Sequence, residues 1–492
     1  MGAHHDPAKT LAKLDALIGA VRDEAQQRLA AWPPAGPAFE PSARNLAAWL
    51  ALRRHDLRPL QQSLMALGLS SLGRLESRVL EALDAVRASL AAIAGEAGHA
   101  RPTAHQFFAG ERRLQARAAA LFGPAQAGRP VAVLVTCPGE SAGDPAFFMD
   151  LAQRGVEAIR INCAHDDATA WGRMIDHAHA ASSSTGHRLR IFMDLAGPKI
   201  RTGKVRLERG HRLRRGDTLA VARPGALRQA HRDVGPPAAE CTLRAVVQAA
   251  QPGHRLFYDD GKFGATVLDV HDWGLLARID TCEDKSVKLK PEKGLNFPDT
   301  AFHVDALTDK DLADLDFVAL HADAVEYSFV QCAGDVVLLQ QALAARRDDW
   351  RDMALVLKIE TAHAIERLPD IVVQAASQQP AAVMIARGDL AVEIGFDRTA
   401  EMQEEMLWLA EAAQVPAIWA TQVLEHLVAK GTPSRGEMTD AAMAARAECV
   451  MLNKGPFVAD GIAALETLLV RMAAHQHKKT PELRPLRSWP RP

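Results

Sequence analysis

The chain has few of the features that assign a protein to a class at first sight. Its six cysteines include no CxxC pair and no evenly spaced framework, so the sequence indicates reduced thiols rather than disulfides. Basic and acidic residues nearly cancel, which leaves a formal net charge of -2 and no electrostatic reason to expect nucleic acid or an anionic membrane as partner. No long uninterrupted apolar run is present, and the N-terminus lacks the basic-then-apolar order of a secretory signal. We therefore expect a cytoplasmic protein without a membrane span.

The 492 residues, of which 48% are hydrophobic, suffice for roughly two to four domains. Residues 7–122 are rich in Ala, Leu, Arg and Glu, with apolar residues at three-four spacing such as Leu57, Leu60 and Leu64. This pattern predicts helices, interrupted by the prolines at 33–37. We expect a helical bundle that packs on the main domain or on a partner, and no residue in it suggests catalysis.

From residue 130 the pattern changes to short apolar, β-branched runs that alternate with helical segments. Two helix starts are marked by Asp144 before Pro145 and by Thr308 with Asp311. Eight such strands, apolar until their last residues, predict an α/β fold, a (β/α)8 TIM barrel, with an open doubly wound sheet as the alternative. The predicted strands are Val131–Cys137, Val156–Asn162, Leu189–Leu195, Val325–Phe329, Ala354–Glu360, Ala381–Arg387, Pro416–Thr421 and Cys449–Lys454.

The alternation of strands and helices fails between residues 204 and 291. Short alternating runs and a turn at Tyr258–Gly261 predict a small β domain inserted after the third strand. The predicted organisation is an N-terminal helical extension (1–125), a first barrel segment (130–203), an inserted β lid domain (204–291), a second barrel segment (292–475) and a tail (476–492).

Polar residues stand at the predicted carboxyl ends of the strands, which meet at one mouth in a barrel. A purely structural barrel does not need so many polar groups there, so this end is the candidate functional site. The residues are Thr136, Arg160 with Asn162, Asp194, Ser328, Lys358 with Glu360, Arg387-Gly388-Asp389, Thr421 and Asn453.

Five of these residues have side chains suited to particular chemistry. Glu360 and Asp389 offer two carboxylates from neighbouring strands, which suits Mg²⁺, although capping or salt-bridging carboxylates are the alternative. Lys358 lies on the same side of its strand as Glu360 and suits a transferring phosphoryl group or a structural ion pair. Arg160 offers a planar fork for phosphate or a buried salt bridge. Thr421 either relays a proton to a carbon or bonds its own backbone.

Taken together, these motifs resemble the pyruvate kinase family. The matching stretches follow the family order over residues 130–475, and the inserted segment stands where that family carries its mobile lid. The stretches are IRINCAH (159–165), MDLAGPKIRTG (193–203), EKGLNFPD (292–299), LTDKDLADL (307–315), LKIE (357–360), MIARGDLAVEI (384–394), ATQVLEHLV (420–428) and PSRGEMTDAA (433–442).

The resemblance implies transfer of a phosphoryl group from phosphoenolpyruvate to ADP, which gives pyruvate and ATP. By the same resemblance, Glu360 and Asp389 would hold Mg²⁺. Lys358 would stabilise the phosphoryl group, Arg160 would bind the phosphate, and Thr421 would protonate the enolate. Such a site works mainly by positioning and charge neutralisation.

The resemblance also implies binding residues on either side of the transferred group. The backbone at Gly388 and Asp389 would receive the substrate carboxylate. The partners would be phosphoenolpyruvate or pyruvate and ADP or ATP, and a homo-oligomer is expected, as a dimer or another assembly. The nucleotide side would be lined by Asn162, His165, Arg201 and Lys293.

The sequence departs from the family at the monovalent-cation region, which comprises Asn162, Asp194 and Lys199 here. Ala164 replaces a hydroxyl residue, Leu195 replaces a threonine, and Lys199 stands where a glutamate is common. Because Lys199 brings a fixed positive charge, we expect that K⁺ is not required.

Two further departures concern the last strand and the C-terminus. The run Asn453-Lys454-Gly455-Pro456 replaces a Ser-Gly-Glu-Thr run whose polar side chains support the proton relay in the family. No counterpart of the family's C-terminal regulatory domain is present, so we expect no activation by sugar phosphates. Two rival interpretations stay open: a Mg²⁺-dependent aldolase or lyase that acts on pyruvate-like oxoacids, and a catalytically weak paralogue that senses ligand and signals through the N-terminal helical region.

Overall fold

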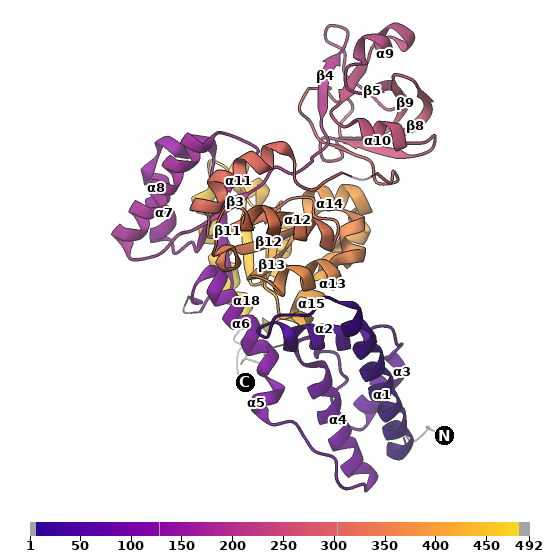
Figure 1. The fold of residues 1–492 in the computed structure, drawn as a ribbon, viewed down its shortest axis with the longest axis vertical. Coiled ribbons are helices and arrows are strands. Elements are labelled where there is room, and N and C mark those ends of the chain that lie inside the picture. The colour runs from indigo at the N-terminus through magenta and orange to yellow at the C-terminus, as the bar shows by residue number, and fades with distance from the viewer. Residues whose placement is uncertain (1–5, 127, 303, 482–492) are drawn as a thin grey trace, which may run out of the picture.

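The centre of the molecule is a closed barrel of eight parallel strands, seen in a computed structural model that describes residues 6–126, 128–302 and 304–481 (Figure 1). The strands follow the order β1-β15-β14-β13-β12-β11-β3-β2. Each overlaps one of the eight predicted runs, so the predicted (β/α)8 barrel is confirmed. The strands are β1 (Ala132–Thr136), β2 (Ala158–Asn162), β3 (Arg190–Asp194), β11 (Ala324–Tyr327), β12 (Ala354–Ile359), β13 (Ala381–Ala386), β14 (Ala417–Ala420) and β15 (Cys449–Leu452).

The barrel strands are buried on both faces, as their continuous apolar runs require. The helix starts predicted at Asp144 and Thr308 are also confirmed, because Asp144 accepts a hydrogen bond from the backbone of Ala146 and Thr308 forms a capping box with Asp311. The surrounding helices are α7 (Pro145–Gln153), α8 (Ala168–Thr185), α11 (Asp309–His321), α12 (Ala333–Ala344), α13 (Ala362–Ala376), α14 (Arg387–Ile394), α15 (Phe396–Ala412), α16 (Glu425–Lys430), α17 (Arg435–Ala444) and α18 (Val458–Ala473).

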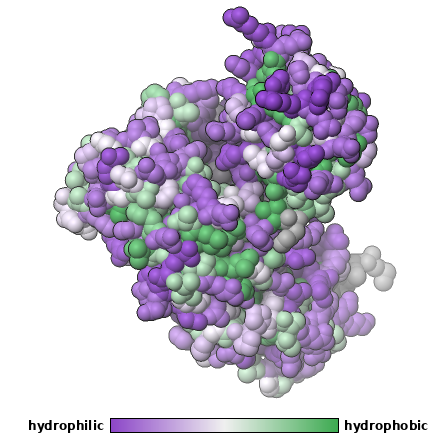
Figure 2. All heavy atoms as spheres, turned by 45° about the horizontal axis from the view of Figure 1, so that its top comes forward, coloured by the Kyte–Doolittle hydropathy of each residue, from purple (hydrophilic) through white to green (hydrophobic). Residues whose placement is uncertain are grey.

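A seven-stranded sheet is inserted between β3 and α11 and has a hydrophobic core of its own. It forms the lobe at the top of Figure 1, on the side of the barrel away from the N-terminal helices. On the face shown in Figure 2 this lobe is mostly hydrophilic. Its elements are β4 (Thr202–Arg206), β5 (Thr218–Ala222), α9 (Leu227–Val234), β6 (Ala238–Cys241), α10 (Arg244–Ala249), β7 (Arg255–Tyr258), β8 (Phe263–His271), β9 (Gly274–Cys282) and β10 (Leu295–Asn296).

The N-terminal region is helical and packs on the barrel of the same chain. Its buried residues belong to one continuous hydrophobic cluster with the outer layer of the barrel, and α2 and the short turn Glu76–Arg78 contact α15. The main helices are α1 (Pro7–Ala31), α2 (Glu40–Leu52), α3 (Arg58–Ala66), α4 (Val79–Ala94), α5 (Ala104–Phe107) and α6 (Ala109–Phe122).

Asn45 of α2 ties this region to the barrel through backbone groups. Its side-chain amide donates to the carbonyl oxygens of Glu76 and Ala412, at 2.7 and 2.8 Å. Its Oδ1 accepts from the backbone N–H of Val79 at 2.9 Å. One half-buried amide therefore joins α2, α4 and the end of α15.

The C-terminal part of the described chain returns to the same end of the barrel. A small hairpin of β16 (Gln476–His477) and β17 (Thr480–Pro481) follows α18. In this hairpin, Lys478 pairs with Glu448 and Lys479 pairs with Glu76. Residues 482–492 of the predicted tail lie outside the described residues. Over the part of the chain that is described, no helix is long and apolar enough to cross a membrane, and all six cysteines are free.

Phe122 closes the lower end of the barrel. It is the last residue of α6, is 2% exposed, and stacks on Phe192 inside the barrel with ring centroids 5.9 Å apart. We expect Phe122→Ala to lower the free energy of unfolding by about 3–5 kcal/mol, because a buried ring leaves a cavity. Urea denaturation followed by circular dichroism measures this loss. Phe108→Ala is the control, because Phe108 is 43% exposed, and an equal loss in both variants would contradict the plugging role of Phe122.

Candidate active site

A cavity of about 170 Å³ opens at the carboxyl ends of the barrel strands, at the mouth where the sequence predicts function. Most of the predicted site residues meet there, although they are spread over more than 250 positions of the chain. Those that line the cavity are Arg160, Asn162, Asp194, Lys199, Arg201, Lys358, Glu360, Asp389 and Thr421.

Asp194 is the centre of the charged cluster. It is 2% exposed, and its Oδ1 lies 3.0 Å from both Lys358 Nζ and Ser328 Oγ. Its Oδ2 accepts from Lys358 at 3.2 Å and from the guanidinium of Arg160. Burial opposes ionisation of Asp194, but Lys358 and Arg160 outweigh it and hold the pKa of this carboxyl below its usual value. Both cations thereby have fixed positions in the cavity wall.

Glu326 is a buried carboxylate that the sequence interpretation missed. It lies on β11 with no exposed surface, and its Oε2 accepts from Arg160 Nε at 3.1 Å. Burial and the neighbouring Asp194 raise its pKa to about 7, against the effect of Arg160. The sequence does contain a signal for this residue, because Glu326 is an acid inside the apolar run of the fourth predicted strand.

Lys199 forms an ion pair with Asp389, one of the two carboxylates predicted to hold Mg²⁺. Its Nζ lies 2.9 Å from Oδ2 of Asp389, while the nearby Asn162 uses its Oδ1 to accept from the backbone of Ala164. Neither Ala164 nor Leu195, which both line the cavity, offers a side-chain oxygen. The fixed ammonium group therefore stands against Asp389 at the mouth of the barrel.

Glu360 and Asp389 are the residues that would hold a divalent cation. Asp389 Oδ1 is buried without a hydrogen-bond partner. Burial raises the pKa of Glu360, and the charge of Asp389 raises it as well, against the effect of Lys358, whose Nζ lies 3.3 Å from Glu360 Oε1. A divalent cation held by both carboxylates would favour their ionised forms. No group of three or more His, Cys, Asp or Glu side chains with metal-site geometry occurs in the described ranges. A two-carboxylate site suits Mg²⁺, which keeps several water or substrate ligands.

Thr421 has a backbone conformation that is rare for its type. Its φ is 60°, and Gln422 and Leu424 follow with φ of 57° and 49°, although β-branched residues seldom adopt positive φ. Such residues cost about 1–3 kcal/mol each and are concentrated at functional sites. The strained turn aims Thr421 at the start of α14, where its Oγ1 accepts from the backbone N–H of Gly388 at 2.9 Å. The hydroxyl proton stays available to a bound molecule.

Arg387 supports this turn from below. Its Nε donates to the carbonyl of Ala420 at 3.0 Å, and its Nη2 donates to that of Thr421 at 2.6 Å. The guanidinium also pairs with Asp440 of α17 and lies 4.6 Å from the ring centroid of Trp419. Arg387 was noted at a strand end, but its supporting role depends on contacts that the sequence does not reveal.

The residues predicted for the nucleotide side are only partly brought together. Arg201 lines the cavity and donates to the carbonyl of Glu292 at 3.3 Å. Lys293 points instead to Asp259 of the inserted domain, at 3.2 Å. His165 lies outside the cavity lining, and burial, Lys454 and Arg201 lower its pKa. Of the four residues predicted for the nucleotide side, Asn162 and Arg201 therefore line the cavity, whereas His165 and Lys293 do not.

The segment after the eighth strand is Asn453-Lys454-Gly455-Pro456, in place of the polar Ser-Gly-Glu-Thr run of the family. Asn453 does not line the cavity, to which this strand contributes only Met451. Gly455 packs on α16, because an added Cβ would lie 2.5 Å from the carbonyl oxygen of Val428. This loop therefore contributes packing to the site wall and no side chain that bonds Thr421.

Comparison with known proteins agrees with this geometry. A family model described as "Pyruvate kinase, barrel domain" matches residues 129–461. A pyruvate kinase of Agrobacterium vitis is 30% identical over 357 residues, which cover 70% of this chain and 70% of the relative. Pyruvate kinases of Corynebacterium efficiens and Mycobacterium tuberculosis are 28% and 29% identical, and the matches cover 64% and 61% of those relatives.

A closed (β/α)8 barrel with a charged mouth and an inserted sheet defines the general class. Within that class, this chain belongs to the pyruvate kinase family. The matched part begins at residue 129, so it includes the barrel and the inserted sheet and leaves out the N-terminal helices.

The paired carboxylates lead to a prediction about divalent cations. We expect Asp389→Asn to weaken Mn²⁺ binding by more than about tenfold, since even outer partners of metal ligands are worth that much. Electron paramagnetic resonance of free Mn²⁺ measures this without substrate. Asp397→Asn, an exposed acid at the start of α15, is the matched control and should bind as wild type. Equal Mn²⁺ affinity in all three proteins would contradict the assignment.

Proposed function

We propose that this protein transfers the phosphoryl group of phosphoenolpyruvate to ADP, giving pyruvate and ATP. The observation that carries the proposal is the cluster in which Lys358 and Arg160 are both fixed by Asp194 beside Glu360 and Asp389. Phosphoryl transfer needs such preorganised charges more than it needs covalent chemistry. Family membership supports the same reaction class.

Each residue of the cluster has a separate role in this proposal. Arg160 presents its guanidinium to the phosphate, and Lys358 neutralises the phosphoryl group as it moves between oxygens. Glu360 and Asp389 would hold Mg²⁺, which when bound offsets the negative charge of the substrate oxygens. The backbone N–H groups at the start of α14, at Gly388 and Asp389, would receive the carboxylate of the substrate, with the Gly388 N–H shared between the carboxylate and Thr421 Oγ1.

Thr421 is the proposed proton donor. After the phosphoryl group leaves, the enolate of pyruvate needs a proton on its terminal carbon. The Thr421 hydroxyl accepts from Gly388 at 2.9 Å, so its own proton points elsewhere, and the residue lines the cavity wall. This arrangement holds the donor next to the proposed carboxylate site without any contribution from the segment after strand eight.

The aldolase or lyase interpretation is not favoured by the comparisons, since the three bacterial relatives are all named pyruvate kinases. The ligand-sensing interpretation differs from the kinase in one measurable way. A sensor would bind phosphoenolpyruvate or oxalate in a Mg²⁺-dependent manner and release no ATP.

The decisive assay is ATP formation from phosphoenolpyruvate, ADP and Mg²⁺. We expect Lys358→Met to lower kcat by about 10² or more, because a buried preorganised charge at the transferring group is lost. Lys204→Met, at an exposed lysine of the inserted domain, should keep wild-type activity. Absence of turnover in the wild type, together with Mg²⁺-dependent oxalate binding by calorimetry, would replace the kinase with the sensor.

We also propose that catalysis does not require K⁺. The support is Lys199, whose ammonium group lies 2.9 Å from Asp389 and adds a permanent positive charge to the site. Ala164 and Leu195 remove two side-chain oxygens that K⁺ would need.

The corresponding prediction compares buffers of equal ionic strength. ATP formation in NaCl should match that in KCl within about a factor of two, because Lys199 is charged in either salt. Choline chloride gives the baseline without a small monovalent cation and should also support activity. A rate that appears only in KCl would contradict the role of Lys199.

A further inference from the structure

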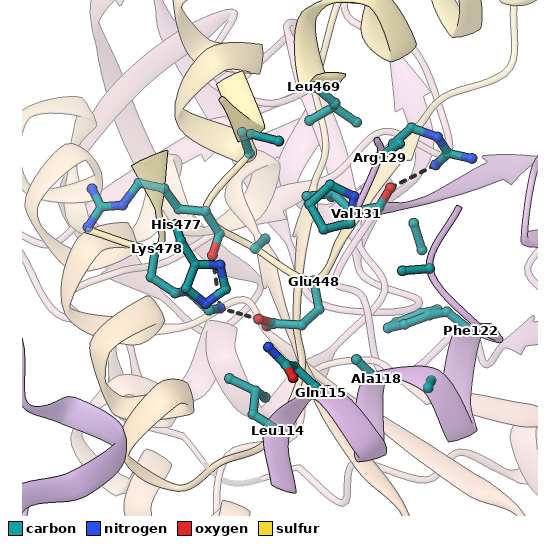
Figure 3. A pocket seen from close by; sticks show the side chains of 18 of the residues that line it. Leu114, Gln115, Ala118, Phe122, Arg129, Val131, Glu448, Leu469, His477 and Lys478 are labelled. Atoms are coloured by element: carbon teal, nitrogen blue, oxygen red, sulfur yellow. Dashed lines mark hydrogen bonds and ion pairs between the residues drawn. The ribbon is translucent and has the colours of Figure 1, made fainter. Parts of the chain in front are cut away.

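A second cavity, of about 450 Å³, lies at the opposite end of the barrel from the active site. Segments that are distant in sequence form its walls: α6, the starts of β1 and β15, the end of α15, and the end of α18 with the hairpin that follows. Figure 3 shows Leu114, Ala118 and Phe122 of α6 along one side, with Val131 and Leu469 across from them. The site belongs to the junction between the N-terminal helices and the barrel.

The size and lining of this cavity are those of a small-molecule site. Ligand pockets usually measure about 300–1,000 Å³ and combine apolar walls with a few polar groups. Here the walls are mainly apolar, and a few charged side chains stand among them. The volume is more than twice that of the cavity at the barrel mouth.

Most charged groups of the lining are already neutralised by a partner. Arg129 pairs with Glu157 at 2.8 Å, deep in the wall. Figure 3 shows the ion pair between Glu448 and Lys478 on the other side. The remaining two pairs connect lining residues to neighbours behind the wall: Arg446 with Glu404, and Glu111 with Arg78.

Glu411 is the exception among the charged lining residues. Within the described residues, the Glu411 side chain forms no hydrogen bond or ion pair. It lines the cavity and is half-buried. Burial, together with the charges of Glu76 and Glu448, raises its pKa to about 7 against the opposing effect of Lys478 and Lys479. It also lies at the last turn of α15, where the helix dipole disfavours negative charge. A cation placed in the cavity would relieve these costs.

We propose that this cavity binds a small apolar molecule that carries a protonated amine, with the ammonium group on Glu411 and the hydrocarbon part against Leu114, Phe122 and Leu469. One unpaired carboxylate in an apolar enclosure selects a cation with an apolar body over an anion or a sugar phosphate. Because the walls come from several distant segments, a bound ligand joins the N-terminal helices and the hairpin to the barrel and stabilises the folded protein. The site is distinct from the proposed catalytic cavity.

The test uses 2-phenylethylamine as the probe and 2-phenylethanol as its neutral counterpart, at pH 8 and without substrate or metal. Calorimetry should show saturable binding of the amine, and thermal unfolding should shift upward with amine concentration. We expect the alcohol to bind at least about tenfold more weakly, since it forms no charged hydrogen bond. Equal binding of the two probes, or no saturable amine binding at millimolar concentration, would overturn the proposal.

Three variants locate the site. Glu411→Gln keeps the shape and should lower amine affinity about tenfold or more, whereas Glu405→Gln, an exposed acid on the same helix, should leave it unchanged. Ala118→Phe fills the cavity and should abolish binding of the amine while the protein stays folded. Unchanged affinity in Glu411→Gln or in Ala118→Phe would place the amine elsewhere and refute the site. Neither outcome depends on whether the barrel mouth catalyses phosphoryl transfer.

The pH dependence gives an independent check. Between pH 8 and pH 6 Glu411 gains a proton, so amine affinity should fall as the pH is lowered through about 7. His477 lines the same cavity, so the comparison is repeated with His477→Gln, in which the fall should persist. The other charged groups near Glu411 are Glu76, Glu448, Lys478 and Lys479. A fall that disappears in His477→Gln and persists in Glu411→Gln would overturn the assignment to Glu411.

Discussion

The charge balance around Asp194 is the constraint on which the proposed site depends. Four cations, Arg160, Lys199, Arg201 and Lys358, stand against four carboxylates at the barrel mouth, and of these carboxylates only Asp194 pairs with two of the cations. Burial and neighbouring carboxylates raise the pKa values of Glu326 and Glu360. A bound divalent cation would add positive charge to a mouth whose charges otherwise balance. The same residues that disfavour full ionisation of the cluster therefore prepare it for a highly anionic substrate.

Different segments of the chain cover the two ends of the barrel. The inserted sheet stands beside the mouth, whereas α6 and the C-terminal hairpin close the opposite end (Figure 1). Phe122 enters the barrel interior from below, and Lys479 connects the hairpin to the N-terminal helices through Glu76. Contacts at the lower end thus stabilise the barrel without occupying the cavity at its mouth.

Much of the fold followed from the sequence, because buried parallel strands have to be continuous apolar runs. All eight barrel strands were predicted from these runs, and two helix starts were predicted from capping residues. The ends of the strands located the mouth of the barrel. Contacts between side chains were beyond the same reasoning. The ion pair of Lys199 with Asp389, the partner of Glu326 and the support that Arg387 gives to Thr421 each join elements that lie far apart in the chain. The sequence also left undetermined whether the N-terminal helices pack on the barrel or on a partner. An amphipathic pattern shows that a helix has an apolar face, but it does not identify the surface against which that face packs.

The altered segment after strand eight is best understood from what holds Thr421. Its turn is fixed from α14 and α17, through the bonds of Arg387 to two carbonyls and to Asp440. Gly388 of α14 holds the hydroxyl itself. None of these contacts involves Asn453 or its neighbours, so replacement of a polar run there leaves the position of the proposed proton donor intact. A threonine that has given up its proton must regain one from solvent, so the replacement bears on that step rather than on substrate binding or phosphoryl transfer.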